Sequence, residues 1–169
     1  MIARAVKTIL ITQEQLFRAT VLVGGRRLLD VLNDGLTEHL QVRDVEVFHD
    51  VAMQEMVARF PTACVRKSAL SLVIVPQEKH EAPEQRFFSY IQKLQRRAFV
   101  AVPGYEVTGQ VHLLHPGDAL SVLTRELNEF FPVTQAKLRH VSAPNETLEV
   151  PVVMVHKPMV SLFWLEEEP

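Results

Sequence analysis

The sequence repeats itself, and this feature constrains the fold more than any other. Residues 6–76 match residues 96–166, at an offset of 90 near both ends of the match and 91 in its middle. Both changes of offset fall in turn-like stretches, where an inserted residue costs little stability. The identical pairs include Val21/Val111, Pro61/Pro151, Val65/Val155 and Lys67/Lys157 at 90, and Leu32/Leu123, Glu38/Glu129, His49/His140 and Ala52/Ala143 at 91. We therefore predict one unit of about 70 residues, present in two copies.

Each copy has the pattern of a small β-rich unit with one helix. Apolar and polar residues alternate over 17–23 and 107–113, which is typical of half-buried strands. Leucines at helical spacing follow over 28–36 and 120–127. The chain is expected to be mainly β (α+β), a tandem duplication of a β-β-α-β-β-β small barrel or roll, because barrel closure hides strand edges. The predicted strands are 7–11, 17–23, 42–48, 57–66 and 69–75, then 97–102, 107–113, 133–141, 148–156 and 159–165.

The second predicted helix has residues that are typical of helix starts and ends. Asp118 is placed to cap it, Phe130 and Phe131 extend its apolar stripe, and Pro132 is expected to end it. The first helix is bracketed by glycines instead, which we interpret as turn residues rather than a phosphate-binding loop.

Three segments follow from the repeat: a first β repeat over 1–76, a linker over 77–97, and a second β repeat over 98–169. The linker sequence predicts an amphipathic helix that joins the repeats and packs on its neighbours. The alternative is a basic helix that binds a membrane surface or an acidic partner. Its apolar stripe consists of Phe87, Tyr90, Ile91 and Leu94.

The last strand of each copy is apolar on both faces, so both faces must be covered. We expect the cover to be the other repeat, the linker helix or another subunit. Candidate interface residues on these strands are Val73, Val75, Phe163 and Leu165, together with the linker stripe.

Composition excludes several classes of protein. The chain has 169 residues, 47% of them hydrophobic, but no run approaches the roughly 20 apolar residues of a membrane span. The opening residues lack a signal-peptide core, so a cytoplasmic location is expected. Cys64 is the only cysteine and aligns with Met154, which predicts a core position rather than thiol chemistry.

Histidines are the residues most suggestive of chemistry. His49 and His140 recur at equivalent positions, but no nucleophile or carboxylate recurs beside both, so we interpret them as strand-end residues that bond a turn. His112 and His115 have no matching pair in the first copy, which weighs against a metal site. We therefore expect no catalytic residues, no metal and no cofactor.

Two resemblances bear on the fold and its partners. The segments 65–71 and 155–161 resemble the closing motif of bacterial Sm-like RNA-binding proteins, in which Lys67 and Lys157 match the motif lysine. Residues 107–111, with Gly109 at their centre, also resemble an early Sm strand. RRLLDVLND and DALSVLTRELNEFFPVTQAKL resemble an uncharacterised bacterial family of single or tandem small β domains, which implies a fold but no reaction.

Charge is distributed unevenly over the segments. The net charge is +1 over residues 1–76, +2 over 77–97 and −5 over 98–169, counting Lys and Arg against Asp and Glu. Phosphate backbones bind clustered cations, so nucleic acid would bind the first repeat and the linker. The candidate contacts are Arg66, Lys67, Arg96, Arg97 and Lys157.

Three functional hypotheses follow. The first is a non-enzymatic module that assembles with itself or another protein, because the scaffold is duplicated and no chemistry is. The alternative is an Sm-like binder of RNA or single-stranded nucleic acid. The third is a small-molecule-binding regulator or enzyme with a site between the repeats, near His49 and His140.

Overall fold

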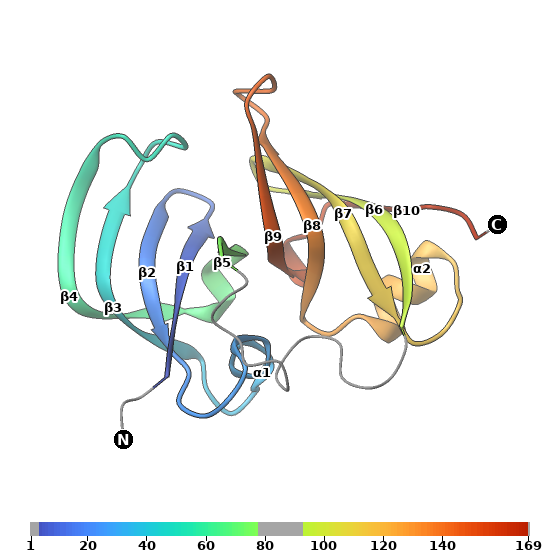
Figure 1. Ribbon diagram of the computed structural model, residues 1–169, viewed down its shortest axis with the longest axis horizontal. Helices are drawn as coiled ribbons and strands as arrows, with labels where there is room; N and C mark the ends of the chain where they lie inside the picture. The colour runs from blue at the N-terminus through green and yellow to red at the C-terminus, as the bar shows by residue number, and fades with distance from the viewer. Residues whose placement is uncertain (1–3, 78–92, 169) are drawn as a thin grey trace.

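The computed structural model describes residues 4–77 and 93–168, in which ten strands form one antiparallel sheet (Figure 1). The strand order is β10-β6-β7-β8-β9-β5-β1-β2-β3-β4. The predicted mainly-β class is confirmed, and both copies have the β-β-α-β-β-β order. The elements are β1 (Ala5–Thr12), β2 (Leu16–Leu22), α1 (Leu28–Asn33), β3 (His39–Phe48), β4 (Met56–Arg66), β5 (Leu70–Val75), β6 (Leu94–Val102), β7 (Tyr105–Leu113), α2 (Ala119–Ser121), β8 (Phe130–His140), β9 (Thr147–His156) and β10 (Leu162–Leu165).

The two repeats have the same strand order and the same backbone irregularities. In each, the fifth strand pairs with the first, and the order then continues to the second, third and fourth strands. Asp44 in β3 and Gln135 in β8, equivalent at an offset of 91, have positive φ angles of 51° and 48°. Each lies at the register shift between its strand and the second strand of its repeat. Such β-bulges bend a strand, so the repeats curve alike although the two bulge residues differ.

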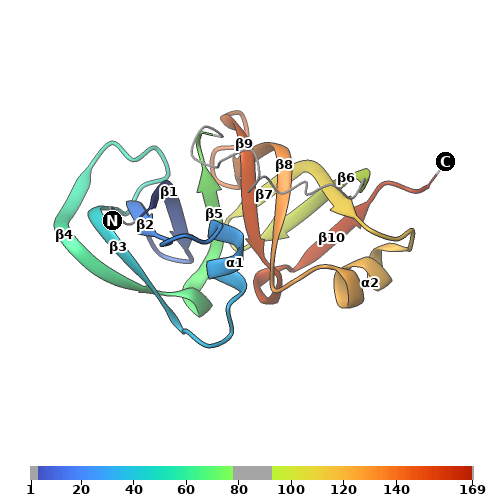
Figure 2. The same cartoon turned by 60° about the horizontal axis from the view of Figure 1, so that its bottom comes forward.

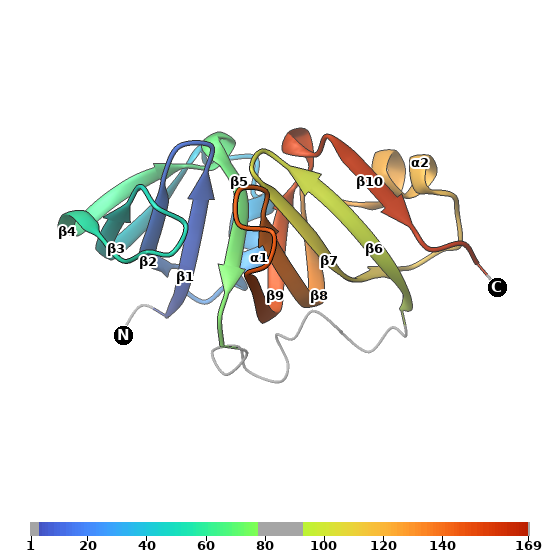
Figure 3. The same ribbon diagram turned by 90° about the horizontal axis from the view of Figure 1, so that it is seen from above.

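The repeats are joined by a strand pair rather than standing as two closed barrels. β5 pairs with β1 on one side and with β9 of the second repeat on the other, in the register Leu72↔Val155 to Val75↔Val152. Figure 3 shows β5 between β1 and β9, with β4 and β10 at the two ends. Of the barrel or roll predicted for each repeat, the closed barrel is not formed in the described residues, because one open sheet runs through both repeats.

β5 contributes side chains to two cores. Leu72 and Ile74 pack with the core of the second repeat, whereas Leu70, Val73 and Val75 pack with that of the first. Successive side chains of a strand point to opposite faces, and a register shift at Ser71 puts Leu70 on the face of Val73 and Val75, so one strand closes both cores. The prediction that 69–75 needs cover on both faces is confirmed, and its cover is the other repeat.

Phe130 and Phe131 are the main error in the predicted helices. α2 spans only Ala119–Ser121, and a π-helical turn continues over Val122–Glu126. The two phenylalanines begin β8 and, as neighbours in a strand, pack into opposite cores, Phe130 with the first repeat and Phe131 with the second. Pro132 therefore lies within β8 and does not end a helix. The predicted cap is confirmed, since Asp118 Oδ1 accepts a hydrogen bond of 2.8 Å from the amide of Ser121.

The first helix also packs across the junction (Figure 2). α1 buries Leu28 and Leu32, whereas Leu36 lies beyond its end and is 94% exposed. Asn33 at the end of α1 donates through Nδ2 to the carbonyl of Phe130 at 2.9 Å, and its Oδ1 accepts from the Phe130 amide at 2.8 Å. The side chain thus satisfies both backbone groups of one residue in the other repeat.

The linker prediction is tested only in part. Leu94 lies in β6, which begins there, and not on a helix. Phe87, Tyr90 and Ile91 lie outside the described residues. No helix within 4–77 and 93–168 is long and apolar enough to cross a membrane.

Leu72 gives a direct test of the shared core. We expect Leu72→Ala to lower the free energy of unfolding by about 2 to 5 kcal/mol, because it leaves a cavity where a fully buried side chain crosses the junction. Chemical denaturation followed by circular dichroism measures this. The matched control Leu36→Ala should change stability by less than about 0.5 kcal/mol; equal effects of the two variants would contradict the described packing.

Candidate functional site

The two ends of the sheet are the most distinctive surface of the molecule. No described residue pairs with the outer edge of β4, which pairs with β3, or with that of β10, which pairs with β6. Their equivalents in the other repeat, β9 and β5, pair with each other. The chain thus contains one formed junction between repeats, and at its two ends the equivalent strands each have an edge without a partner among the described residues.

Exposure differs sharply between equivalent residues of β5 and β10. Leu72 and Ile74 are 0% and 2% exposed, whereas their counterparts Leu162 and Trp164 are 51% and 45% exposed. The candidate interface residues Phe163 and Leu165 face inward and pack on the core of the second repeat, as Val73 and Val75 do on the first. The outward residues are the alternate ones, Leu162 and Trp164, which are not among the candidate interface residues predicted from the sequence.

The fourth strands show the same difference. Met154 in β9 is fully buried, whereas its counterpart Cys64 in β4 is exposed. The prediction of a core cysteine is wrong, because no described strand covers β4 as β5 covers β9. Met56, Val57 and Phe60 are likewise large apolar residues exposed along β4.

Beside the β4 edge, the first repeat has an open groove of about 610 Å³. In the second repeat, the equivalent residues pack in one cluster with Leu72 and Ile74. The groove therefore corresponds to the space that those two side chains fill in the second repeat. Its apolar lining includes Phe17, Val45, Val47, Phe60, Ala63 and Val65, equivalent to Val107, Ala136, Leu138, Val150, Val153 and Val155.

The motif lysines bond within the repeats. The amides of Lys67 and Lys157 donate to the carbonyls of the equivalent Glu38 and Glu129, at 2.9 and 2.7 Å. Lys67 Nζ donates to the Asp34 carbonyl at 3.0 Å and Thr37 Oγ1 at 2.8 Å, and Lys157 Nζ to the Leu127 carbonyl at 2.9 Å. Burial lowers the pKa of Lys67. Both ammonium groups therefore bind the segment that follows the helix of their own repeat. A phosphate could bind either lysine only if these hydrogen bonds broke.

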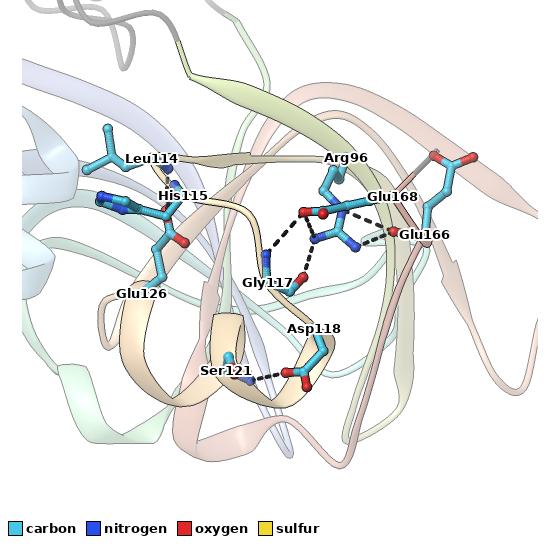
Figure 4. A network of polar contacts seen from close by, with 9 residues as sticks. All are labelled: Arg96, Leu114, His115, Gly117, Asp118, Ser121, Glu126, Glu166 and Glu168. Atoms are coloured by element: carbon cyan, nitrogen blue, oxygen red, sulfur yellow. Dashed lines mark hydrogen bonds and ion pairs between the residues drawn. The ribbon is translucent and has the colours of Figure 1, made fainter.

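The candidate arginines do not gather into one surface. Arg66 is exposed at the end of β4, whereas Arg96 and Arg97 lie on β6, near the other end of the strand order. Arg96 donates to the carbonyls of Gly117 and Glu166 and approaches the Glu168 carboxylate at 3.4 Å (Figure 4). It thereby holds the segment after β10 against the loop before α2. The Arg97 guanidinium lies 6.0 Å from the centre of the Trp164 ring.

The recurrent histidines His49 and His140 have different environments. His140 Nδ1 accepts a 3.1 Å hydrogen bond from the Ser142 amide and lies 2.6 Å from Ser142 Oγ, so it bonds its turn as the sequence predicts. His49 is exposed. A cavity of about 270 Å³ between the repeats is lined by His140 and by Tyr105, whose buried hydroxyl has no hydrogen-bond partner among the described residues. Burial raises the pKa of Tyr105 to about 12.

His112 and His115 make different contacts. His112 Nε2 lies 2.6 Å from Thr134 Oγ1, whereas the backbone amide of His115 donates to the Glu126 carboxylate at 3.1 Å. Within the part of the chain that the structure describes, no group of three metal-ligating side chains occurs.

The buried histidine of the junction is one that the sequence analysis did not select. His156 Nδ1 donates to the Leu70 carbonyl at the start of β5, at 2.8 Å, and the ring stacks on Phe130 at 4.3 Å. Its Nε2 lies 3.2 Å from the Glu129 carboxylate. The counterpart of His156 is the exposed Arg66, so only the formed junction has this contact.

Comparison of the chain with family models, with curated proteins and with solved structures finds no match. The resemblances to Sm-like proteins and to tandem small β domains therefore stay predictions that rest on the sequence motifs.

Lys67 tests the internal role of the motif lysines. We expect Lys67→Met to lower the free energy of unfolding by about 1 to 3 kcal/mol, because the Asp34 carbonyl and Thr37 hydroxyl lose their common donor. Denaturant titration measures this. Lys7→Met, at an exposed lysine of β1, serves as the control and should stay within about 0.5 kcal/mol of the wild type. Equal stability of the two variants would instead leave Lys67 free to bind a partner.

His112 predicts a pH dependence. Burial lowers the pKa of His112 from 6.5 to about 4, so the unfolded chain binds a proton first as the pH falls. Stability should therefore decrease from about pH 6.5 to about pH 4 and level off below that. Between pH 7 and 4, we expect the free energy of unfolding of the wild type to fall by about 1 to 3 kcal/mol more than that of His112→Leu, as measured by denaturant titration. Leucine is the chosen replacement because Leu22 is the equivalent residue of the first repeat. Identical pH profiles would contradict the burial of His112.

Proposed function

We propose that this chain is a non-enzymatic assembly module whose two duplicated β units bind other protein through the outer edges of their common sheet. The observation that carries the proposal is the contrast between equivalent strands. β5 and β9 bury each other, whereas β10 and β4 leave Leu162, Trp164 and Phe60 about half exposed.

An edge like that of β4 supports strand addition by a partner. The strand is 11 residues long and exposes three large apolar side chains, Met56, Val57 and Phe60. Exposed edges are usually shortened, charged or covered, because their free backbone groups pair with other chains. A partner strand would satisfy those groups and cover the apolar side chains at once.

The test is the size of the particle that contains this chain in extracts of the cells that produce it. We expect the wild type to elute as a particle larger than the 19.2 kDa chain, and Phe60→Lys/Trp164→Lys to elute smaller, because both edges then carry a charge. Leu36→Lys, exposed and outside both edge strands, is the control and should elute as the wild type does. A wild-type chain that elutes free would contradict the proposal.

The same experiment addresses the nucleic-acid hypothesis. Nuclease should leave the particle intact if protein edges hold it together. Dissociation by nuclease would favour Arg66, Arg96 and Arg97 as phosphate contacts instead.

A further inference from the structure

We propose that the partner at both edges is a second copy of this chain, docked head to tail, with β10 of one molecule added to β4 of the next. This inference rests on the proposed function and names its partner. It follows from the duplication, since β10 and β4 are the equivalents of β5 and β9, which already pair.

The formed junction specifies the register of the second one. Within the chain, Leu72, Val73, Ile74 and Val75 lie opposite Val155, Met154, Val153 and Val152. Shifting the first set by +90 and the second by −90 gives the pairing between molecules. Leu162, Phe163, Trp164 and Leu165 then lie opposite Val65, Cys64, Ala63 and Thr62 of the next copy.

The exposed side chains fit this register. Leu162 and Trp164 are equivalent to Leu72 and Ile74, which fill the core of the second repeat. In the next copy they would enter the groove beside β4, whose apolar lining is equivalent to the residues around Leu72 and Ile74. The groove and the two exposed residues are thus the two halves of one packing arrangement.

Charge also favours this contact. β4 contains Arg59 and Arg66 and no carboxylate, whereas β10 runs directly into Glu166, Glu167 and Glu168. Continued by three residues, the antiparallel register brings this acidic segment alongside Arg59. Glu168 itself already contacts Arg96 and the Gly117 amide of its own chain. A β4 edge paired with another β4 edge would place cations together, so the charges support the head-to-tail arrangement.

Disulfide trapping tests the register with the native Cys64. Phe163→Cys places a thiol directly opposite Cys64 of the next copy, at a spacing that a disulfide can bridge. Under mild oxidation of the purified full chain, we expect bands at multiples of 19.2 kDa on a non-reducing gel, and a peptide joining Cys64 to position 163 by mass spectrometry. Glu166→Cys, three residues further along and exposed, keeps Leu162, Phe163 and Trp164, so it is the matched control and should give few such bands. Equal trapping by both variants would overturn the register.

Mixing two blocked variants tests the polarity of the contact. Trp164→Lys leaves the β4 edge intact and Phe60→Lys leaves the β10 edge intact, and both side chains are about half exposed. In light scattering, each variant alone should have the mass of one chain, and an equimolar mixture should have twice that mass. A symmetric contact between like edges would instead leave one variant dimeric on its own, which would overturn the head-to-tail pairing.

The wild-type mass separates this inference from the proposed function. Purified wild type should form a multimer whose weight-average mass rises with concentration. A purified wild type of 19.2 kDa at all concentrations, without cross-links, would overturn self-association. If the extract particle still depended on Phe60 and Trp164, edge binding would stand with a different protein as partner.

Discussion

The pairing of β5 with β9 is the contact on which the rest of the structure depends. It places Leu72 and Ile74 in the core of the second repeat and Val152 and Met154 in the core of the first, so neither repeat completes its core alone. Hydrogen bonds from Asn33 to Phe130 and from His156 to Leu70 also connect the two repeats. The free energy gained by burying apolar side chains scales with the buried area. The four buried apolar residues of β5 and β9 therefore contribute far more to stability than the polar contacts around them.

Much of the architecture could be predicted from the sequence, because the repeat fixes it twice. The element order follows from the offset between the two copies. Strands β2 and β7 follow from their alternation of apolar and polar residues. The second helix is shorter than the sequence predicts, for a physical reason. Phe130 and Phe131 fit a helical stripe, yet as neighbours in a strand they reach two different cores. Only knowledge that two cores flank β8 would have separated these interpretations.

The candidate surface was harder to predict, since equivalent residues have different environments. Cys64 and Met154 align, and so do Ile74 and Trp164, but one member of each pair is buried and the other exposed. Sequence shows which positions correspond, and not which copy supplies the missing neighbour. Similarly, Lys67 and Lys157 recur as a functional motif would, whereas their ammonium groups bond to carbonyls inside each repeat.

The junction also determines what the chain exposes while it is being made. Leu72 and its partner Val155 are 155 − 72 = 83 positions apart, so the first repeat leaves the ribosome well before β9 exists. During that interval β5 has an open apolar edge, as β10 has in the finished chain. The nascent first repeat therefore passes through a stage in which both of its edges can pair with the wrong strand, and completion of β9 ends that stage for one of them.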